Sequence, residues 1–197
     1  MARASCGEYD DPDVRTWSDG SVLTQEEVWG RLLSDTGHDG AWLSQFWSRV
    51  GYSQGAAYGQ LGTLGGGNHY FELNRNAEGR FFATVHSGSR ALGQAVCRYH
   101  QGICSRRSRF DAGEFEKRTR HLRKVRDRAE RYRLEREVEA AMRAEQGPPY
   151  LQGEEAAAYL EDMRFTQAYA AANRRVMLAA VGALFDASPG VAVDTVH

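Results

Sequence analysis

The run Leu61-Gly62-Thr63-Leu64-Gly65-Gly66-Gly67-Asn68-His69-Tyr70-Phe71-Glu72-Leu73, with Val85-His86-Ser87-Gly88-Ser89-Arg90 shortly after it, decides the fold. Its four glycines in six positions cost backbone entropy and pack no side chains, so such a loop usually brings main chain close to another group. Two apolar runs, residues 70–73 and 81–85, flank a polar turn over residues 74–79. This pattern predicts a β-hairpin with the glycine-rich loop at its open end.

Two histidines stand at the open end of this hairpin. If the turn centres between Ala77 and Glu78, His69 lies opposite His86, and opposed residues in an antiparallel pair have Cα atoms roughly 4.5–5.5 Å apart. The sequence therefore predicts two imidazoles side by side between two glycine-bearing loops. A single histidine at a strand end is more often a hydrogen-bonded structural residue, but an opposed pair favours metal or phosphate chemistry.

The residues after the hairpin suit an anion. Ser87 and Ser89 offer hydroxyls, and Arg90 can bind a phosphate through two parallel hydrogen bonds. A helix is expected over residues 92–103, with Val96, Cys97 and Ile103 on its buried side. We expect Cys97 and Cys104 to be core thiols and not nucleophiles, because nothing in the sequence argues for a lowered pKa.

Composition narrows the class of protein. The 197 residues are 42% hydrophobic, enough to bury a core in one or two domains, and the net charge of -1 demands no polyanionic partner. The three cysteines include no CxxC pair, which argues against a disulfide framework and a zinc ribbon. No signal peptide and no apolar run of about 18 residues is found, so we expect a cytoplasmic protein without a membrane partner.

The first half of the chain divides near residue 40. Residues 1–40 are expected to be a variable lead-in, irregular over 1–20, followed by a short helix that Thr24 caps and that runs through Leu33, with Glu27 at the capping-box position. Residues 41–50 carry apolar side chains at helical spacing. We expect this face to pack in the core and not to stack on nucleic-acid bases.

Residues 106–150 are expected to form a basic helical insertion and linker. Thirteen Lys/Arg stand against six Asp/Glu from Arg106 to Arg136. The spacing of Leu122, Val125, Ala129 and Tyr132, continued by Val138 and Met142, predicts one long helix over 106–145. A solvated face is favoured over a track for phosphodiesters, because acids are interleaved, and residues 147–149 (Gly-Pro-Pro) end the helix.

The last part of the chain predicts a long helix and a strand. The helix covers about 154–185, with a seam made of Tyr159, Met163, Thr166, Ala170, Asn173, Met177, Ala180 and Leu184. Asn173 on that apolar seam should be hydrogen-bonded. A β run over residues 191–196 ends on His197, and we expect a chain cut there and not finished.

These motifs resemble those of the RtcB-type RNA-splicing ligases. The resemblance lies in Gln60–Glu72 and Val85–Gly93, with support from Tyr159 to Arg174 and from Asp194 to His197. It covers roughly residues 45–105 and 155–197. It implies an α+β fold in which a hairpin that carries metal histidines packs against long helices, with residues 41–197 as a partial ligase domain.

The resemblance also implies an activity: joining an RNA 2′,3′-cyclic phosphate or 3′-phosphate end to a 5′-hydroxyl end, with GTP and two Mn²⁺ ions, in tRNA splicing or RNA repair. It implies that His69, His86 and His197 bind the metals. It places Arg90, Ser87 and Ser89 near RNA phosphates. The implied GTP site comprises Asn68, His69, Tyr70, Phe71, Glu72 and His197.

The chain departs from this family in two places. The DxGxGxxC element, whose Asp and Cys complete the metal site, has no counterpart in residues 1–60, and Cys6 lacks the Asp and glycines that should precede it. The histidine that becomes guanylylated belongs after His197. We therefore expect an isolated chain to be inactive: a fragment, a degenerate copy, or one that needs a complementing ligase fragment or activating protein.

Two other functions compete with the ligase. A non-catalytic RNA-binding module would grip RNA with the basic helix. A metal-dependent phosphoesterase is disfavoured, because no Asp or Glu stands beside the histidines, and Glu72 is expected on the opposite face of the strand. Imidazole suits Mn²⁺ less well than carboxylate does, so the metal would need further ligands.

Overall fold

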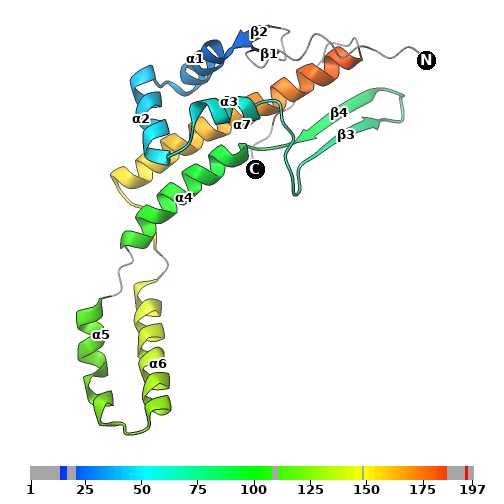
Figure 1. Cartoon of the computed structure of the whole chain (residues 1–197). Helices are drawn as coiled ribbons and strands as arrows, with labels where there is room; N and C mark the ends of the chain where they lie inside the picture. Colours follow the sequence, from blue (N-terminus) through cyan, green and yellow to red (C-terminus); the bar gives the residue numbers. More distant parts are fainter. Residues whose placement is uncertain (1–13, 17–20, 108–110, 148, 186–193, 195–197) are drawn as a thin grey trace. The chain divides into compact units, whose positions relative to one another are not determined.

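The computed structural model describes residues 14–16, 21–107, 111–147, 149–185 and 194. These divide into two compact units, which are described separately (Figure 1). Unit 1 comprises Met1–Arg98 and Ala158–His197, and unit 2 comprises Tyr99–Ala157. Helices α4 (Arg90–Arg107) and α7 (Glu154–Leu184) each belong to both units.

The described part of unit 1 is mostly helical, with two small antiparallel strand pairs. The α+β expectation therefore holds only in part, since helices dominate. Besides α4 and α7, its elements are β1 (Val14–Thr16), β2 (Val22–Thr24), α1 (Gln25–Thr36), α2 (Gly40–Val50), α3 (Gln54–Gln60), β3 (Tyr70–Arg75) and β4 (Phe81–His86). β1 corrects the expectation that residues 1–20 are irregular throughout, because Val14–Thr16 pair with β2.

Helix α1 begins where the sequence predicts. The Glu27 backbone N–H donates to Thr24 Oγ1, and the Thr24 N–H donates to Glu27 Oε2 at 2.8 Å, which makes a capping box. The Thr24 backbone hydrogen bond also lowers the pKa of the Glu27 carboxyl. The helix continues one turn past Leu33, until Gly37 ends it with a φ of 73°.

The core of unit 1 is aromatic. Phe46 and Trp47 of α2 pack against Phe165 of α7, with ring centroids 4.9 and 6.2 Å from it. Trp29 of α1 stacks on Tyr169 of α7 at 6.3 Å. The predicted core role of the α2 aromatics is confirmed, and α1 contributes to this same core.

The buried face of α7 differs in part from the predicted seam. Thr166, Ala170 and Asn173 are buried as expected, whereas Leu184 is 79% exposed. The helix also buries Asp162, which the ion pair with Arg49 neutralises. The buried face of α7 includes polar residues whose hydrogen bonds and ion pairs offset the cost of burial. A prediction from apolar spacing alone therefore does not locate this face correctly.

The β3–β4 hairpin has a register one residue away from the predicted one. Tyr70, not His69, pairs with His86, and Leu73 pairs with Ala83, not Phe82. Asn76 and Arg80 close the turn, with a 3.0 Å bond from Asn76 N to Arg80 O and Gly79 at a φ of 83°. This leaves a three-residue loop, and an odd loop length shifts the register by one.

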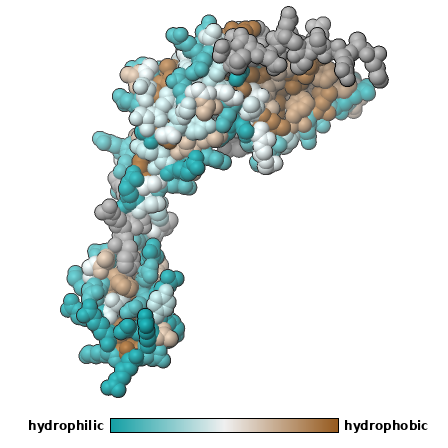
Figure 2. Space-filling model, in the orientation of Figure 1, coloured by the Kyte–Doolittle hydropathy of each residue, from teal (hydrophilic) through white to brown (hydrophobic). Residues whose placement is uncertain are grey.

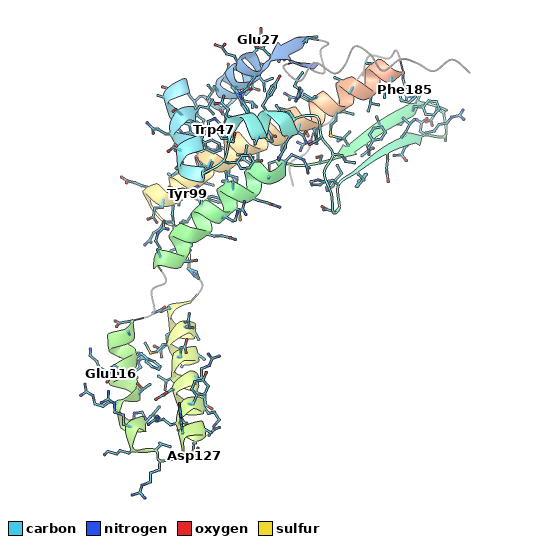
Figure 3. All side chains as sticks on the ribbon, viewed as in Figure 1. Glu27, Trp47, Tyr99, Glu116, Asp127 and Phe185 are labelled. Atoms are coloured by element: carbon cyan, nitrogen blue, oxygen red, sulfur yellow. The ribbon has the colours of Figure 1, made fainter. Side chains whose placement is uncertain are left out.

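The described part of unit 2 corrects the prediction of one long helix over 106–145. It contains α5 (Ala112–Thr119), a 3₁₀ turn η1 (Arg120–Lys124) and α6 (Arg128–Gln146), which form a helical hairpin. Asp127 lies at the tip and caps α6 by accepting from Ala129 N and Glu130 N (Figure 3). Leu122 and Met142 are buried, but Tyr132 is 63% exposed.

The hydropathy of the surface differs between the units. Hydrophobic residues gather over the C-terminal part of α7 in unit 1, whereas unit 2 is largely hydrophilic (Figure 2). In the part of the chain with described positions, no helix is long and apolar enough to cross a membrane. The expected strand over 191–196 and His197 lie outside the described residues, except for Asp194.

Candidate phosphate and metal site

Asn173 holds the two glycine-bearing loops together. Its Oδ1 accepts from the backbone N–H of Gly62 at 2.8 Å and of Thr63 at 3.2 Å. Its Nδ2 donates to Ser87 Oγ at 3.1 Å and to the Gly88 carbonyl at 3.2 Å. The side chain is fully buried, so the prediction of a hydrogen-bonded Asn173 is confirmed. The long helix α7 thereby sets the spacing of the two loops.

Ser87 lies inside this junction. Its hydroxyl donates to the Leu64 carbonyl at 2.8 Å and accepts from Asn173 Nδ2, and the residue is buried. Arg174 donates from Nη1 to the Ser87 carbonyl at 3.0 Å and from Nε to Asp194 at 2.8 Å. The hydroxyl hydrogen of Ser87 is therefore committed within the protein, which leaves Ser89 and Arg90 as the more available of the predicted phosphate ligands.

Arg90 is anchored on the glycine-rich loop. Its Nε donates to Thr63 Oγ1 at 3.2 Å, and its Nη1 lies 3.2 Å from His69 Nδ1. Gly65 has a φ of 93°, a conformation that favours glycine, and a Cβ there would also displace the Arg90 guanidinium. Arg90 also has a φ of 56°, a left-handed conformation that is costly for a residue with a side chain.

A cavity of about 420 Å³ lies beside this arrangement in unit 1. His69 and His86 form part of its wall, with ring centroids 6.0 Å apart and planes at 62°. Residues 87–89, the first turns of α4 and the central part of α7 complete the lining. Tyr70 stacks on His86 at 5.2 Å, which orients that imidazole.

The structure brings most of the predicted site residues together. His69, His86, Ser87 and Ser89 line the cavity, and Arg90 contacts His69. Asn68, Phe71 and Glu72 are exposed and do not line it. The one-residue shift in register puts Glu72 on the same strand face as Tyr70 and His86, not on the opposite face as expected.

Arg174 and Cys97 are among the other residues that line the cavity. In the sequence, Arg174 is only the last residue of the segment from Tyr159 that supports the resemblance. Its place directly after the buried Asn173 is the signal that it reaches the cavity and the Ser87 carbonyl. Cys97 is exposed there, which corrects its expected core position. The buried face of α4 follows an i, i+3, i+4, i+8 spacing (Leu92, Ala95, Val96 and His100), and Cys97 falls outside that set.

The two histidines fit a metal in spacing. A metal–nitrogen bond is about 2 Å long, so rings 6.0 Å apart can serve one ion or two ions about 3.5–4 Å apart. No group of three or more His, Cys, Asp or Glu able to hold a metal is found among the described residues. His69 and His86 therefore form a partial ligand set that needs further donors.

The sequence of the chain matches the profile of a known family. The profile of the family described as tRNA-splicing ligase RtcB matches residues 33–196, and the chain belongs to that family.

Two curated relatives come from amoebae. The RNA-splicing ligase RtcB homolog 2 of Entamoeba dispar is 31% identical over 107 residues, which cover 47% of this chain. The RNA-splicing ligase RtcB homolog 1 of Entamoeba histolytica is 31% identical over 103 residues, which cover 45% of this chain. Each match spans only 18% of the relative. No solved structure matches the chain significantly.

Proposed function

We propose that this chain is the part of an RtcB-type RNA ligase that holds metal and phosphate, for joining an RNA 3′-phosphate or 2′,3′-cyclic phosphate end to a 5′-hydroxyl end. The observation that carries the proposal is the Asn173 junction. It fixes the GGGNH and HSGSR loops so that His69 and His86 line one cavity and Arg90 contacts His69. This spatial grouping supports a shared ligand for both loops.

The residues have separate roles in this proposal. His69 and His86 bind Mn²⁺ together with His197, which lies three residues beyond the Asp194 that Arg174 holds. The ions, when bound, offset negative charge on phosphate oxygens during activation by GTP. Arg90 and Ser89 bind and orient an RNA phosphate. The exposed segment Asn68–Glu72 is available to the nucleotide.

The described residues supply only part of the chemistry. Mn²⁺ prefers oxygen ligands, and no carboxylate lines the cavity among the described residues. We infer that residues 41–197 are a partial ligase domain, and that a complementing ligase fragment or another protein supplies the remaining ligands and the guanylylated histidine. A cytoplasmic location stays a prediction.

Calorimetric titration with Mn²⁺ tests the metal ligands. Wild-type protein should bind Mn²⁺ weakly, and His69→Ala or His86→Ala should lower the affinity at least tenfold, since each removes one of few ligands. His121→Ala, at an exposed position in unit 2, is the matched control and should behave like wild type. Equal heats for all four proteins would exclude the metal role.

A second candidate is an RNA-binding module, and the tip of unit 2 favours it. Arg120, Arg123 and Lys124 are exposed there on η1. RNA binding through this tip should weaken steeply with salt and should not respond to EDTA. Charge reversal at all three positions should then abolish binding in a filter assay. Unchanged RNA affinity would exclude this candidate.

A metal-dependent phosphoesterase has less support. Such a site needs a carboxylate to complete its ligands or to act as a base. No carboxylate lines the cavity among the described residues. Glu72 is on the same strand face as His86 but does not line the cavity either.

A further inference from the structure

Helix α6 of unit 2 carries a stripe of three residues, Arg128, Tyr132 and Arg136, which we call the Arg–Tyr–Arg stripe. Its members lie four positions apart in the sequence, so each step turns only about 40° around the helix, and the stripe spans roughly 12 Å along the helix axis. All three residues are exposed, and Tyr132 has 63% of its surface accessible. One aromatic ring thus lies between two guanidinium groups on one side of α6.

The two arginines of this stripe are not neutralised by acids. Within the part of the chain that the structure describes, the side chains of Arg128 and Arg136 make no hydrogen bond or ion pair. The acids that follow on α6 bind other arginines, about one helical turn away: Glu135 binds Arg131, Glu137 binds Arg133, and Glu139 binds Arg143. The stripe therefore keeps two positive charges, although acids are interleaved in the sequence.

The Arg–Tyr–Arg stripe is separate from the contacts that hold the helical hairpin of unit 2 together. Leu134, Val138 and Met142 are less exposed, and they lie on another side of α6. Glu145 accepts hydrogen bonds of 2.9 Å from Arg118 of α5. A single exposed aromatic side chain is ordinary on a protein surface. An exposed ring between two unpaired cations is a less ordinary arrangement, and the hairpin does not need it.

We propose that the Arg–Tyr–Arg stripe binds a single-stranded segment of RNA, with one base stacked on Tyr132 and the neighbouring phosphates bound by Arg128 and Arg136. This inference rests on the proposed function, because it takes RNA as the substrate. It adds that unit 2 holds the single-stranded part of that substrate. It differs from binding at the tip of unit 2, since it uses side chains of α6 and a stacking ring.

The chemistry of the stripe selects this ligand. Proteins that bind single strands without sequence preference combine positive charge along the backbone with aromatic rings on which bases stack. In a duplex the bases are paired and stacked on one another, so they offer no free face to Tyr132. An acidic peptide would satisfy the two arginines but has no planar ring for the tyrosine. Single-stranded RNA therefore uses all three side chains.

Fluorescence anisotropy with a labelled single-stranded RNA of mixed sequence, about twelve nucleotides long, tests the stripe on the full chain. Wild type should bind this RNA more tightly than a duplex of the same length. Tyr132→Ala should weaken binding about tenfold, because the stacking contact is lost. Tyr132→Phe keeps the ring and should bind like wild type. Tyr150→Ala is the control, because it removes a tyrosine that is 67% exposed and lies outside the stripe.

The salt dependence of the affinity supplies a second readout, which reports the phosphate contacts. Replacing both Arg128 and Arg136 by Gln should lower the slope of log affinity against log salt by roughly 1.4, because each contact with a single-strand phosphate contributes about 0.7. Replacing both Arg131 and Arg133 by Gln removes the same charge from α6 at positions that are already paired, and it should keep the wild-type slope. Circular dichroism shows whether each variant is folded.

Several results would overturn the proposal. Folded wild type that binds no RNA, or that binds duplex as tightly as single strand, would refute it. So would equal RNA affinity of Tyr132→Ala and Tyr150→Ala. If charge reversal at the tip abolishes RNA binding while Tyr132→Ala binds normally, the tip holds the RNA and the stripe does not. Displacement of the RNA by polyglutamate as readily as by unlabelled RNA would show a surface for acidic proteins.

The Mn²⁺ titration of the histidine variants separates this proposal from the proposed function. If the stripe fails while His69→Ala still loses Mn²⁺ binding, the metal and phosphate site stands and only the stripe is wrong. If the stripe binds single-stranded RNA as expected while wild type and His69→Ala bind Mn²⁺ equally, the metal role is wrong and the stripe stands.

Discussion

At the scale of single residues, the side chain of Asn173 joins the two loops of the candidate site. One buried amide satisfies main-chain groups of two loops that are more than twenty residues apart in the sequence. Its loss leaves part-buried main-chain groups of both loops and the buried Ser87 hydroxyl without this partner, and each lost bond costs free energy. The site thus depends on a residue that touches no ligand in our proposal.

We predict that Asn173→Ala lowers the free energy of unfolding by roughly 2–4 kcal/mol, because one buried and several part-buried hydrogen bonds are lost together. It should also abolish Mn²⁺ binding at temperatures where the protein is still folded. Urea denaturation followed by circular dichroism measures the first effect, and calorimetry the second. Arg175→Ala, exposed on the same helix, should change neither. Mn²⁺ binding at wild-type strength in a folded Asn173→Ala would show that the junction does not organise the site.

Tyr169 makes a second buried hydrogen bond. Its hydroxyl donates to the Ala57 carbonyl at 2.7 Å, and burial raises the pKa of this hydroxyl above its ordinary value. We predict that Tyr169→Phe lowers the free energy of unfolding by about 1 kcal/mol at neutral pH, through the bond that is lost. Denaturation in urea measures it, with Tyr132→Phe, which is exposed, as the control. A loss no larger than that of the control would contradict the prediction.

The raised pKa also predicts the direction of a pH effect. Above about pH 10 the tyrosine ionises in the unfolded state, while the buried Tyr169 keeps its proton. Ionisation therefore stabilises only the unfolded state, and the free energy of unfolding falls as pH rises. The stability difference between wild type and Tyr169→Phe should therefore shrink as pH rises through that range. Urea unfolding at pH 8 and pH 10.5 measures it. A difference that stays constant or grows would be inconsistent with the buried neutral hydroxyl.

At the scale of elements, turn chemistry sets the β-hairpin. The loop between Asn76 and Arg80 needs a residue with positive φ, and Gly79 supplies it at 83°. Gly79→Ala should destabilise the hairpin by about 1 kcal/mol, because a Cβ disfavours that conformation. Hydrogen exchange of the β3 amides should then speed up several-fold, and Glu78→Ala should leave it unchanged. Equal exchange in the two variants would argue against this turn.

The hairpin also shows which parts of the fold the sequence can predict. Its two strands follow from apolar runs and a polar turn, but its register depends on whether the loop has an even or odd number of residues. Composition does not settle that number. The error of one residue moved Glu72 to the wrong face and paired His69 with His86 directly. The two rings nevertheless meet, since His69 lies just outside the strand, where the loop can turn it.

The helices of unit 2 illustrate a different limit. Apolar spacing continues across Asp111 and Asp127, and so it predicted one helix. Both aspartates instead accept hydrogen bonds from main-chain N–H groups that follow them, and each starts a new helix. An Asp at an N-cap and an Asp on a solvated helix face look alike in the sequence, because only tertiary contacts decide between them.

At the scale of the whole molecule, the candidate site was more predictable than the fold around it. Glycines, histidines and an arginine in two short loops predicted that the two loops meet, and the structure brings His69, His86 and Arg90 together. The partners that position them were harder to predict. Cys97 lines the cavity from α4 although the apolar spacing placed it in the core, and the sequence signal for Arg174 is its place directly after Asn173.

The division into two units predicts that unit 2 is dispensable for the site. Replacing residues 108–147 by a flexible glycine–serine linker should leave the Mn²⁺ affinity unchanged, because every residue that lines the cavity belongs to unit 1. The thermal transition of the aromatic core, followed by tryptophan fluorescence, should remain cooperative. A loss of metal binding in a folded deletion variant would show that unit 2 supports the site.

The hairpin exposes Tyr70, Phe71, Leu73, Phe81 and Phe82 to water, and a two-stranded sheet with so little cover is barely stable by itself. His69 and His86 lie at its base, so an ion that binds them must also freeze the thermal fluctuations of the strands. Part of the intrinsic free energy of ion binding then offsets the loss of conformational entropy in the two strands, and the observed affinity is lower. The metal affinity measured on this chain by itself is therefore a lower limit. A partner that covers the exposed aromatic side chains of the hairpin should raise that affinity without contacting the ion.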